Sequence, residues 1–138
     1  MGYIILNNDL DGISFSIDEE GNWGYIPSGA DTVIPFKKSK TSFTIQIRFI
    51  LHGDHYSSEK GFVYDNTGNN KYSTLSYTYT GSCACKIYGD GTSIKSISAP
   101  GWSSQKTGTI DISSYSEIDA RGISNGTAIS GNLTITFS

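Results

Sequence analysis

The sequence has little charge, and the charge it has is nearly balanced. Ten Lys and Arg stand against thirteen Asp and Glu in 138 residues, so the net charge is −3 and charged residues make up 17%. Nucleic-acid binding generally needs a basic patch that neutralises phosphates. The one basic cluster is Lys37, Lys38 and Lys40, which we interpret as a charged turn. The composition therefore argues against a nucleic-acid partner.

Cysteine and long apolar runs are also scarce. The only cysteines are Cys83 and Cys85, and residues two apart on a strand point to the same face. A disulfide framework would need more cysteines and a zinc site four ligands, so we interpret both as small buried residues of a chain made in a reducing compartment. The early run Tyr3–Leu6 is far too short for a signal peptide or a membrane span. We therefore expect no membrane insertion, and either a protein that is not secreted through a signal peptide of its own or a fragment of a longer protein.

Helical periodicity is missing, whereas alternation of apolar and polar residues is frequent. In the segment 43–51, five large apolar residues alternate with Thr44, Gln46 and Arg48, which predicts a central strand with one buried face. Further strand-like segments, most of them alternating, occur at 3–6, 13–17, 23–25, 61–65, 74–80, 83–88, 92–98, 109–112, 117–121 and 133–137. Pro27 and Pro35 place the segment between them at a sheet edge or across the end of a sandwich.

Turn residues separate these segments at the short spacings typical of a sandwich or barrel. Low charge together with abundant β-branched and aromatic residues favours sheet over disorder. The sequence therefore predicts an all-β fold, an antiparallel β-sandwich of jelly-roll-like form with about nine or ten short strands. A chain of 138 residues is expected to make a single domain over its whole length.

Two clusters have residue types that bind metals. Asn7, Asp9, Asp11 and Asp18 match calcium-loop spacing around Gly12, but the strand-like alternation that follows favours an ordinary Asp-Gly turn. His52, Asp54 and His55 lie within four residues of one another and could seed a metal site or a general base. Their spacing matches no zinc pattern, and a solvated turn is the preferred interpretation. We expect no metal and no cofactor, with both clusters kept as open alternatives.

Catalytic signatures are missing as well. The sequence has no G-x-S-x-G nucleophile elbow and no phosphate-binding loop, so no catalytic residues are assigned and the protein is expected not to be an enzyme. Paired carboxylates for glycoside hydrolysis are distant in sequence, so a small glycan-cleaving enzyme remains an alternative.

Aromatic residues in turns and on polar strand faces are the main resource for binding. Flat amphipathic rings beside Asn, Ser and Thr suit stacking on sugars. The other interpretation is that they cap the sandwich or lie in a subunit interface. The candidate rings are Trp23, Tyr25, Tyr56, Tyr72, Tyr88, Trp102 and Tyr115, and those chosen for glycan binding are Trp102 and the pair Trp23 and Tyr25.

Two segments carry a resemblance to a known group of proteins. Residues 29–36 read GADTVIPF and residues 108–115 read GTIDISSY. Both resemble segments of the small GADTVIPF-motif β domains of phage and prophage tail-associated proteins from Gram-positive bacteria. The resemblance implies a virion-associated module of the tail, baseplate or fibre kind. Such modules are made in the host cytoplasm without a signal peptide and assemble as homo-oligomers, often trimers.

The function expected from these features is a structural module of a virion that binds a cell-surface polysaccharide. A free-standing carbohydrate-binding or adhesin-like sandwich is the first alternative, and the small glycan-cleaving enzyme is the second.

Overall fold

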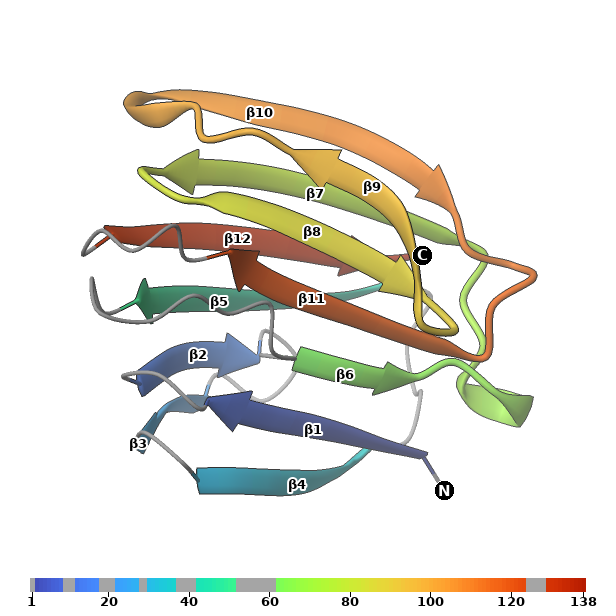
Figure 1. Ribbon diagram of the computed structural model, residues 1–138. Coiled ribbons are helices and arrows are strands. Elements are labelled where there is room, and N and C mark those ends of the chain that lie inside the picture. The colour runs from blue at the N-terminus through green and yellow to red at the C-terminus, as the bar shows by residue number, and fades with distance from the viewer. Residues whose placement is uncertain are drawn as a thin grey trace.

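Short alternating segments form strands throughout the part of the chain that the structure describes. This computed structural model describes residues 2–8, 12–17, 22–27, 30–36, 42–51, 62–123 and 129–138. These residues contain twelve strands and the 3₁₀-helix η1 (Gly68–Asn70), and no helix among them is long and apolar enough to cross a membrane. The strands form two antiparallel sheets packed as two layers (Figure 1).

The last eight strands form a jelly roll. They are β5 (Phe43–Leu51), β6 (Phe62–Asp65), β7 (Thr74–Gly81), β8 (Ala84–Gly89), β9 (Thr92–Ile97), β10 (Gly101–Asp111), β11 (Glu117–Ile123) and β12 (Ile129–Phe137). β5 pairs with β12, β6 with β11, β7 with β10 and β8 with β9. This nested pairing divides them between two four-stranded sheets, β10-β7-β12-β5 and β6-β11-β8-β9, which is the double-sheet jelly-roll arrangement.

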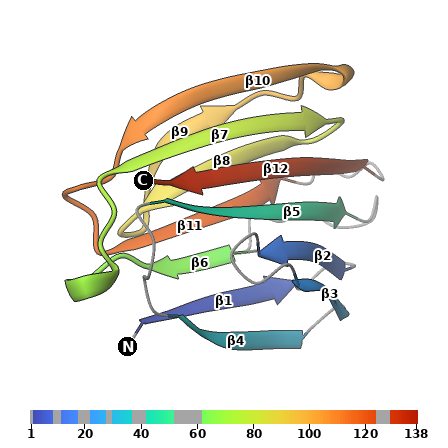
Figure 2. The ribbon, with the colours of Figure 1, turned by 180° about the vertical axis from the view of Figure 1, so that it is seen from behind.

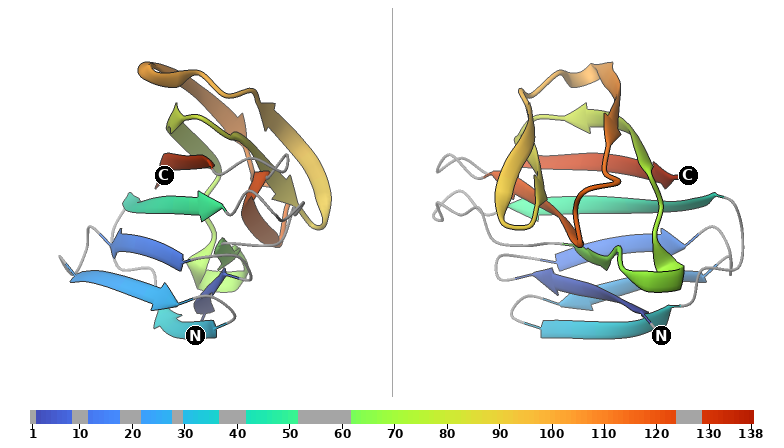
Figure 3. Two further views of the ribbon diagram at one scale, coloured as in Figure 1. Left: turned by 60° about the vertical axis from the view of Figure 1, so that its left-hand side comes forward. Right: turned by 90° about the vertical axis from the view of Figure 1, so that its right-hand side faces the viewer.

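The first four strands extend both sheets. They are β1 (Gly2–Asn8), β2 (Gly12–Ile17), β3 (Asn22–Pro27) and β4 (Ala30–Phe36). The hairpin of β2 and β3 is added beside β5, and β1 with β4 is added beside β6. Sheet A therefore has the order β4-β1-β6-β11-β8-β9, and sheet B has the order β10-β7-β12-β5-β2-β3. Sheet B is nearer the viewer in Figure 2, and Figure 3 shows β9 and β10 together at one edge of the sandwich.

The core lies between the sheets, and in β5, β7, β8 and β12 it is built from alternate residues wherever their side chains are described. Phe43, Ile45 and Ile47 of β5 are buried, which confirms the predicted buried face of this strand over its described side chains. The rings of Tyr64 and Phe137 stack across the two sheets with centroids 4.5 Å apart. Stacked rings add to the stabilisation that burial alone provides, so this aromatic contact helps to join the layers.

The predicted all-β sandwich and its jelly-roll form are confirmed. The described strands number twelve rather than nine or ten. The largest difference in length is β10, which begins at Gly101 although alternation predicted a strand only from Thr109. This strand lies at the edge of sheet B and its register shifts between Gly101 and Lys106; an edge strand with a bulge needs no strict alternation. The proline-flanked segment forms β4, at the edge of sheet A as expected.

Candidate functional site

The described outward side chains of sheet B are polar, and apart from Asp111 at one end they are uncharged. On β7 and β12, buried core residues alternate with half-buried residues that point away from the core. These outward residues, with their neighbours on β5 and β10, are here called the polar face. The polar face consists of Thr44, Gln46, Thr74, Ser76, Thr78, Thr80, Thr107, Thr109, Asn132, Thr134 and Thr136. It ends at Asp111, which pairs with Thr74.

Strand register aligns the polar face into rows that run across the strands. The first row is Thr44, Thr136, Ser76 and Thr109, the middle row is Gln46, Thr134, Thr78 and Thr107, and the third row includes Arg48, Asn132 and Thr80. Neighbouring strands are about 4.8 Å apart, so each row presents polar groups at that interval. In the first row, the hydroxyls of Thr44 and Thr136 are hydrogen-bonded to each other at 3.0 Å.

The rows continue through β2 to the edge strand β3. Ser16 pairs with Gln46 on one side and with Trp23 on the other, and Ser14 pairs with Arg48 and with Tyr25. Directly paired residues of an antiparallel sheet belong to the same face. The register therefore places Trp23 in the middle row and Tyr25 in the third row, at the β3 edge of the polar face.

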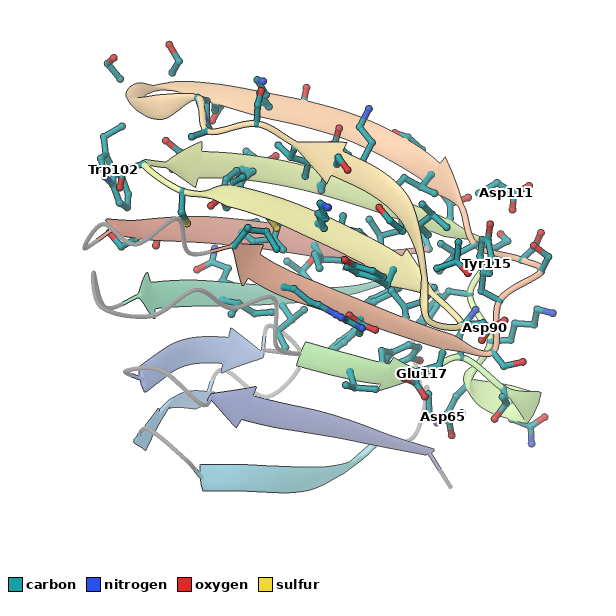
Figure 4. The ribbon with its side chains drawn as sticks, viewed as in Figure 1. Asp65, Asp90, Trp102, Asp111, Tyr115 and Glu117 are labelled. Carbon is teal, nitrogen blue, oxygen red and sulfur yellow. The ribbon has the colours of Figure 1, made fainter. Side chains whose placement is uncertain are left out.

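The third predicted ring, Trp102, lies at the opposite edge of the same sheet. It is on β10, its side chain is 48% exposed, and Figure 4 shows it at the end of the sandwich where β7 ends. The Thr80 hydroxyl lies 3.0 Å from the Gly101 carbonyl and 2.8 Å from the Ser104 carbonyl, which ties the bulge that carries Trp102 to β7. Five strand spacings, about 24 Å, separate β10 from β3. The structure therefore does not bring the three predicted rings into one site.

The other end of the sandwich carries carboxylates that sequence reasoning did not single out. Figure 4 shows Asp65, Asp90, Asp111 and Glu117 there, together with Tyr115. The Asp90 carboxylate accepts hydrogen bonds from the backbone amide of Ser116 at 3.1 Å and from that of Glu117, the first residue of β11, at 2.9 Å. Asp90 also has a φ of +50°, which Asp tolerates better than most residues. This carboxylate therefore holds the turn between β8 and β9 against the start of β11.

Asp111 is likewise engaged locally. Its carboxylate accepts hydrogen bonds from the backbone amide and the hydroxyl of Ser113, and these bonds lower its pKa. The general acid of a glycosidase needs the opposite shift, a raised pKa.

Among the described side chains, no group of three or more His, Cys, Asp and Glu is close enough to hold a metal ion.

The two cysteines lie in the core, as predicted from their spacing. Both Cys83 and Cys85 are buried and free. The Tyr79 hydroxyl donates a hydrogen bond to the Cys83 carbonyl at 2.8 Å and lies 2.9 Å from its sulfur. Burial raises the pKa of both thiols and of the Tyr79 hydroxyl, so all three stay protonated near neutral pH and the thiols are poor nucleophiles.

Most of the predicted metal candidates lie outside the described residues. This holds for Asp9, Asp11 and Asp18, and also for His52, Asp54 and His55. Asn7 lies in β1, and Gly12 begins the strand β2, which confirms the strand predicted at 13–17.

Three of the other candidate rings have packing roles. Tyr72 is buried in the core, and Tyr115 is partly buried against it. Tyr88 lies on the outer face of sheet A under the Arg121 guanidinium, whose central carbon is 3.9 Å from the ring centroid. These positions fit the interpretation of the rings as structural. Tyr56 lies outside the described residues.

Comparisons with known proteins find similarity in solved structures alone. No protein-family model matches the sequence, and a search of curated proteins returns no significant match. The SPBc2 prophage-derived protein YomS aligns with a TM-score of 0.40 and 15% identity, over 69% of this chain and 95% of YomS. The PBSX exported protein XepA aligns with a TM-score of 0.39 and 14% identity, over 98% of this chain and 75% of XepA.

The protein YhaK from Escherichia coli aligns at a TM-score of 0.36 and 7% identity, over 96% of this chain and 74% of YhaK. Two of these three structural neighbours, YomS and XepA, are thus proteins of prophage origin. The jelly-roll topology follows from this chain's own strand pairing, independently of the neighbours.

Proposed function

We propose that this protein is a structural module of a phage or prophage virion, of the tail, baseplate or fibre kind, and that it binds a cell-surface glycan through the polar face of sheet B. The virion assignment is based on the resemblance of residues 29–36 and 108–115 to tail-associated β domains. The glycan assignment is based on the polar face itself. On this proposal the protein acts by contact, without catalysis.

The observation that carries the glycan assignment is the combination of polar rows, uncharged except for Arg48 in the third row, with two aromatic positions at their edge. Hydroxyl and amide groups both donate and accept hydrogen bonds, as the hydroxyls of a sugar do. Trp23 and Tyr25 occupy consecutive register positions at the β3 edge, and aromatic residues are suited to stacking on sugar faces. A glycan chain extending over the strands would therefore meet rings at one edge and polar groups across the rest.

The glycan assignment is tested with cell-wall polysaccharide from the host, immobilised for binding measurements. We expect Trp23→Ala and Tyr25→Ala each to weaken binding about tenfold, equivalent to about 1.4 kcal/mol. Trp102→Ala is the matched control, because it removes an exposed ring from the opposite edge of sheet B. Equal losses for all three variants would show that the polar face is not the site.

The virion assignment is tested in particles and in solution. We expect the chain in gradient-purified phage particles, detected by mass spectrometry. Purified protein should form a homo-oligomer, a trimer by comparison with other appendage proteins, in light scattering after size exclusion. A monomer that binds glycan and never enters particles would support the free-standing carbohydrate-binding module instead.

The glycan-cleaving alternative makes a different prediction. Release of reducing ends from the same polysaccharide, abolished by Asp90→Asn or Glu117→Gln in a folded variant, would favour an enzyme. The present proposal expects no release by the wild-type protein.

A further inference from the structure

We propose that the glycan is a neutral chain and that it lies across the strands of sheet B, along the middle row. This inference rests on the proposed function and adds to it the chemical class of the ligand and its direction on the sheet. The middle row consists of Gln46, Thr134, Thr78 and Thr107 and continues through Ser16 to Trp23.

The absence of charge in the middle row selects a neutral chain. Each of its residues has an uncharged polar side chain. An anionic polysaccharide would lose hydration on this surface without meeting a cation that compensates for it. The one basic residue aligned with the rows is Arg48, in the third row. The middle row is therefore the better match for a sugar chain that has hydroxyl groups and no carboxylates or phosphates.

Strand geometry determines the direction of the chain. Along one strand, outward residues are about 6.8 Å apart, whereas across the strands they follow one another at about 4.8 Å. The polar groups are thus most continuous across the sheet, and the middle row spans about 24 Å from β3 to β10. A chain along this row would have a ring position, Trp23, at one end and hydroxyls of Thr134, Thr78 and Thr107 beyond it.

The first row is less suited to the ligand. Thr44 and Thr136 already share a hydrogen bond, so one donor of the pair is satisfied within the protein. The first row also has no partner on β2 in the described register, because Ile17 of β2 pairs with Ile45 and ends the strand. It therefore does not continue to an aromatic position.

A second copy of the chain is a poorer occupant than a glycan. The centre of a stable interface between subunits is more apolar than the rest of the surface, and the described side chains of the polar face include no apolar residue. Thr and Ser hydroxyls buried against another protein would each need a new partner. A sugar chain provides such partners along its whole length.

Two double variants of matched chemistry test the inference. Thr78→Val with Thr134→Val removes two paired hydroxyls from the middle row, and Thr44→Val with Thr136→Val removes two paired hydroxyls from the first row. Valine keeps the β-branched shape that strands favour. Binding is measured on an array of neutral oligosaccharides and of uronic-acid and phosphate-containing ones, with circular dichroism to confirm that each variant folds.

The expected result has three parts. Neutral oligosaccharides bind and acidic ones do not. The middle-row variant loses about tenfold in affinity, and the first-row variant changes by less than about twofold. The affinity of the wild type is the same from about 0.05 M to about 0.5 M NaCl, because salt screens only charged contacts.

Other results overturn the inference in distinguishable ways. Salt-sensitive binding of acidic members alone, or a first-row loss equal to the middle-row loss, refutes the neutral chain or its path while leaving glycan binding in place. Failure of every member of the array and of host polysaccharide to bind refutes the proposed function together with this inference.

Discussion

The side chain of Asn66 holds both backbone polar groups of Tyr72. The Tyr72 amide donates to Asn66 Oδ1 at 2.8 Å, and Asn66 Nδ2 lies 3.2 Å from the Tyr72 carbonyl. The same side-chain nitrogen lies 3.2 Å from the Ile112 carbonyl and 3.0 Å from the Tyr115 carbonyl. Since Asn66 is only 1% exposed, one buried amide joins the loop after β6 to the loop between β10 and β11.

Asn66→Asp should destabilise the fold strongly at neutral pH. The introduced carboxylate has the shape of the amide but would face three carbonyl oxygens with no proton to donate, at a cost of about 3 kcal/mol or more in the free energy of unfolding. Its pKa would be raised in the folded state, so the loss should shrink as pH falls and the group is protonated. Urea unfolding at pH 7 and at pH 4.5 measures both effects.

Asn69→Asp is the control for this variant, because Asn69 is exposed in η1. We expect it to change stability by less than about 0.5 kcal/mol. Similar losses for the two variants would mean that the bonds of Asn66 contribute little.

Gly131→Ala should be poorly tolerated because the ring of Tyr79 covers this glycine. A β-carbon at position 131 would lie 2.7 Å from Cζ and 2.9 Å from Cε1 of Tyr79, far inside van der Waals contact. Tyr79 is buried and its hydroxyl is bonded to the Cys83 carbonyl, so the ring cannot move away at low cost. We expect a loss of about 2 to 3 kcal/mol in thermal or urea unfolding.

The comparison variant is Gly68→Ala. Gly68 has a φ of +56°, but no atom lies within 4 Å of the place that a β-carbon would take, so its substitution costs only the left-handed backbone, about 1 kcal/mol. If the Gly131 variant were no less stable than this one, the close approach of Tyr79 would be unimportant.

Stability should fall in mildly alkaline solution. Burial raises the pKa of Cys83 and Cys85 in the folded state, whereas in the unfolded chain a thiol titrates near 8.5. Above that pH the unfolded state releases protons that the folded state keeps, so the free energy of unfolding decreases by up to about 1.4 kcal/mol per pH unit for each thiol. Tyr79, whose pKa is also raised, adds to the loss above about pH 10.

The measurement is the urea midpoint of the reduced protein from pH 7 to pH 10. Cys85→Ala should lower the starting stability through the cavity it leaves, and should also make the pH dependence shallower. A midpoint that stays constant over this range would contradict burial of the two thiols.

Arg121→Lys should destabilise sheet A although the charge is kept. The Arg121 Nε donates to Asp119 at 2.9 Å, while its guanidinium lies over the ring of Tyr88. A lysine ammonium cannot reproduce the flat stacking and the directed donor together. Because the Asp119 carboxylate is almost fully buried, we expect a loss of about 1 to 2 kcal/mol.

A double-mutant cycle with Tyr88→Leu separates the two contacts. Coupling between positions 88 and 121 of about 0.5 kcal/mol or more would support the stacking. If the losses of stability of the two single variants simply add, the whole effect of Arg121→Lys comes from its contact with Asp119.

The candidate site shows what the sequence could and could not predict. Trp23, Tyr25 and Trp102 were identified from their residue type and their places in turns or on polar strand faces, which is local information. Register then assigned Trp23 and Tyr25 to rows that contain Gln46 and Arg48, while Trp102 is at the far edge of the sheet. A local sequence pattern cannot predict that these rings lie at opposite edges of the sheet, since this depends on which strands are neighbours.

The sequence alone determined where most strands lie and which of their faces is buried, because alternation with period 2 acts within a single strand. It identified 43–51 as a central strand and Cys83 and Cys85 as buried residues. Tertiary structure alone decided the pairing partners, such as Thr44 with Thr136, which are 92 residues apart. The backbone groups of all strands are alike, so the choice of partner depends on how the whole set of strands closes around one core.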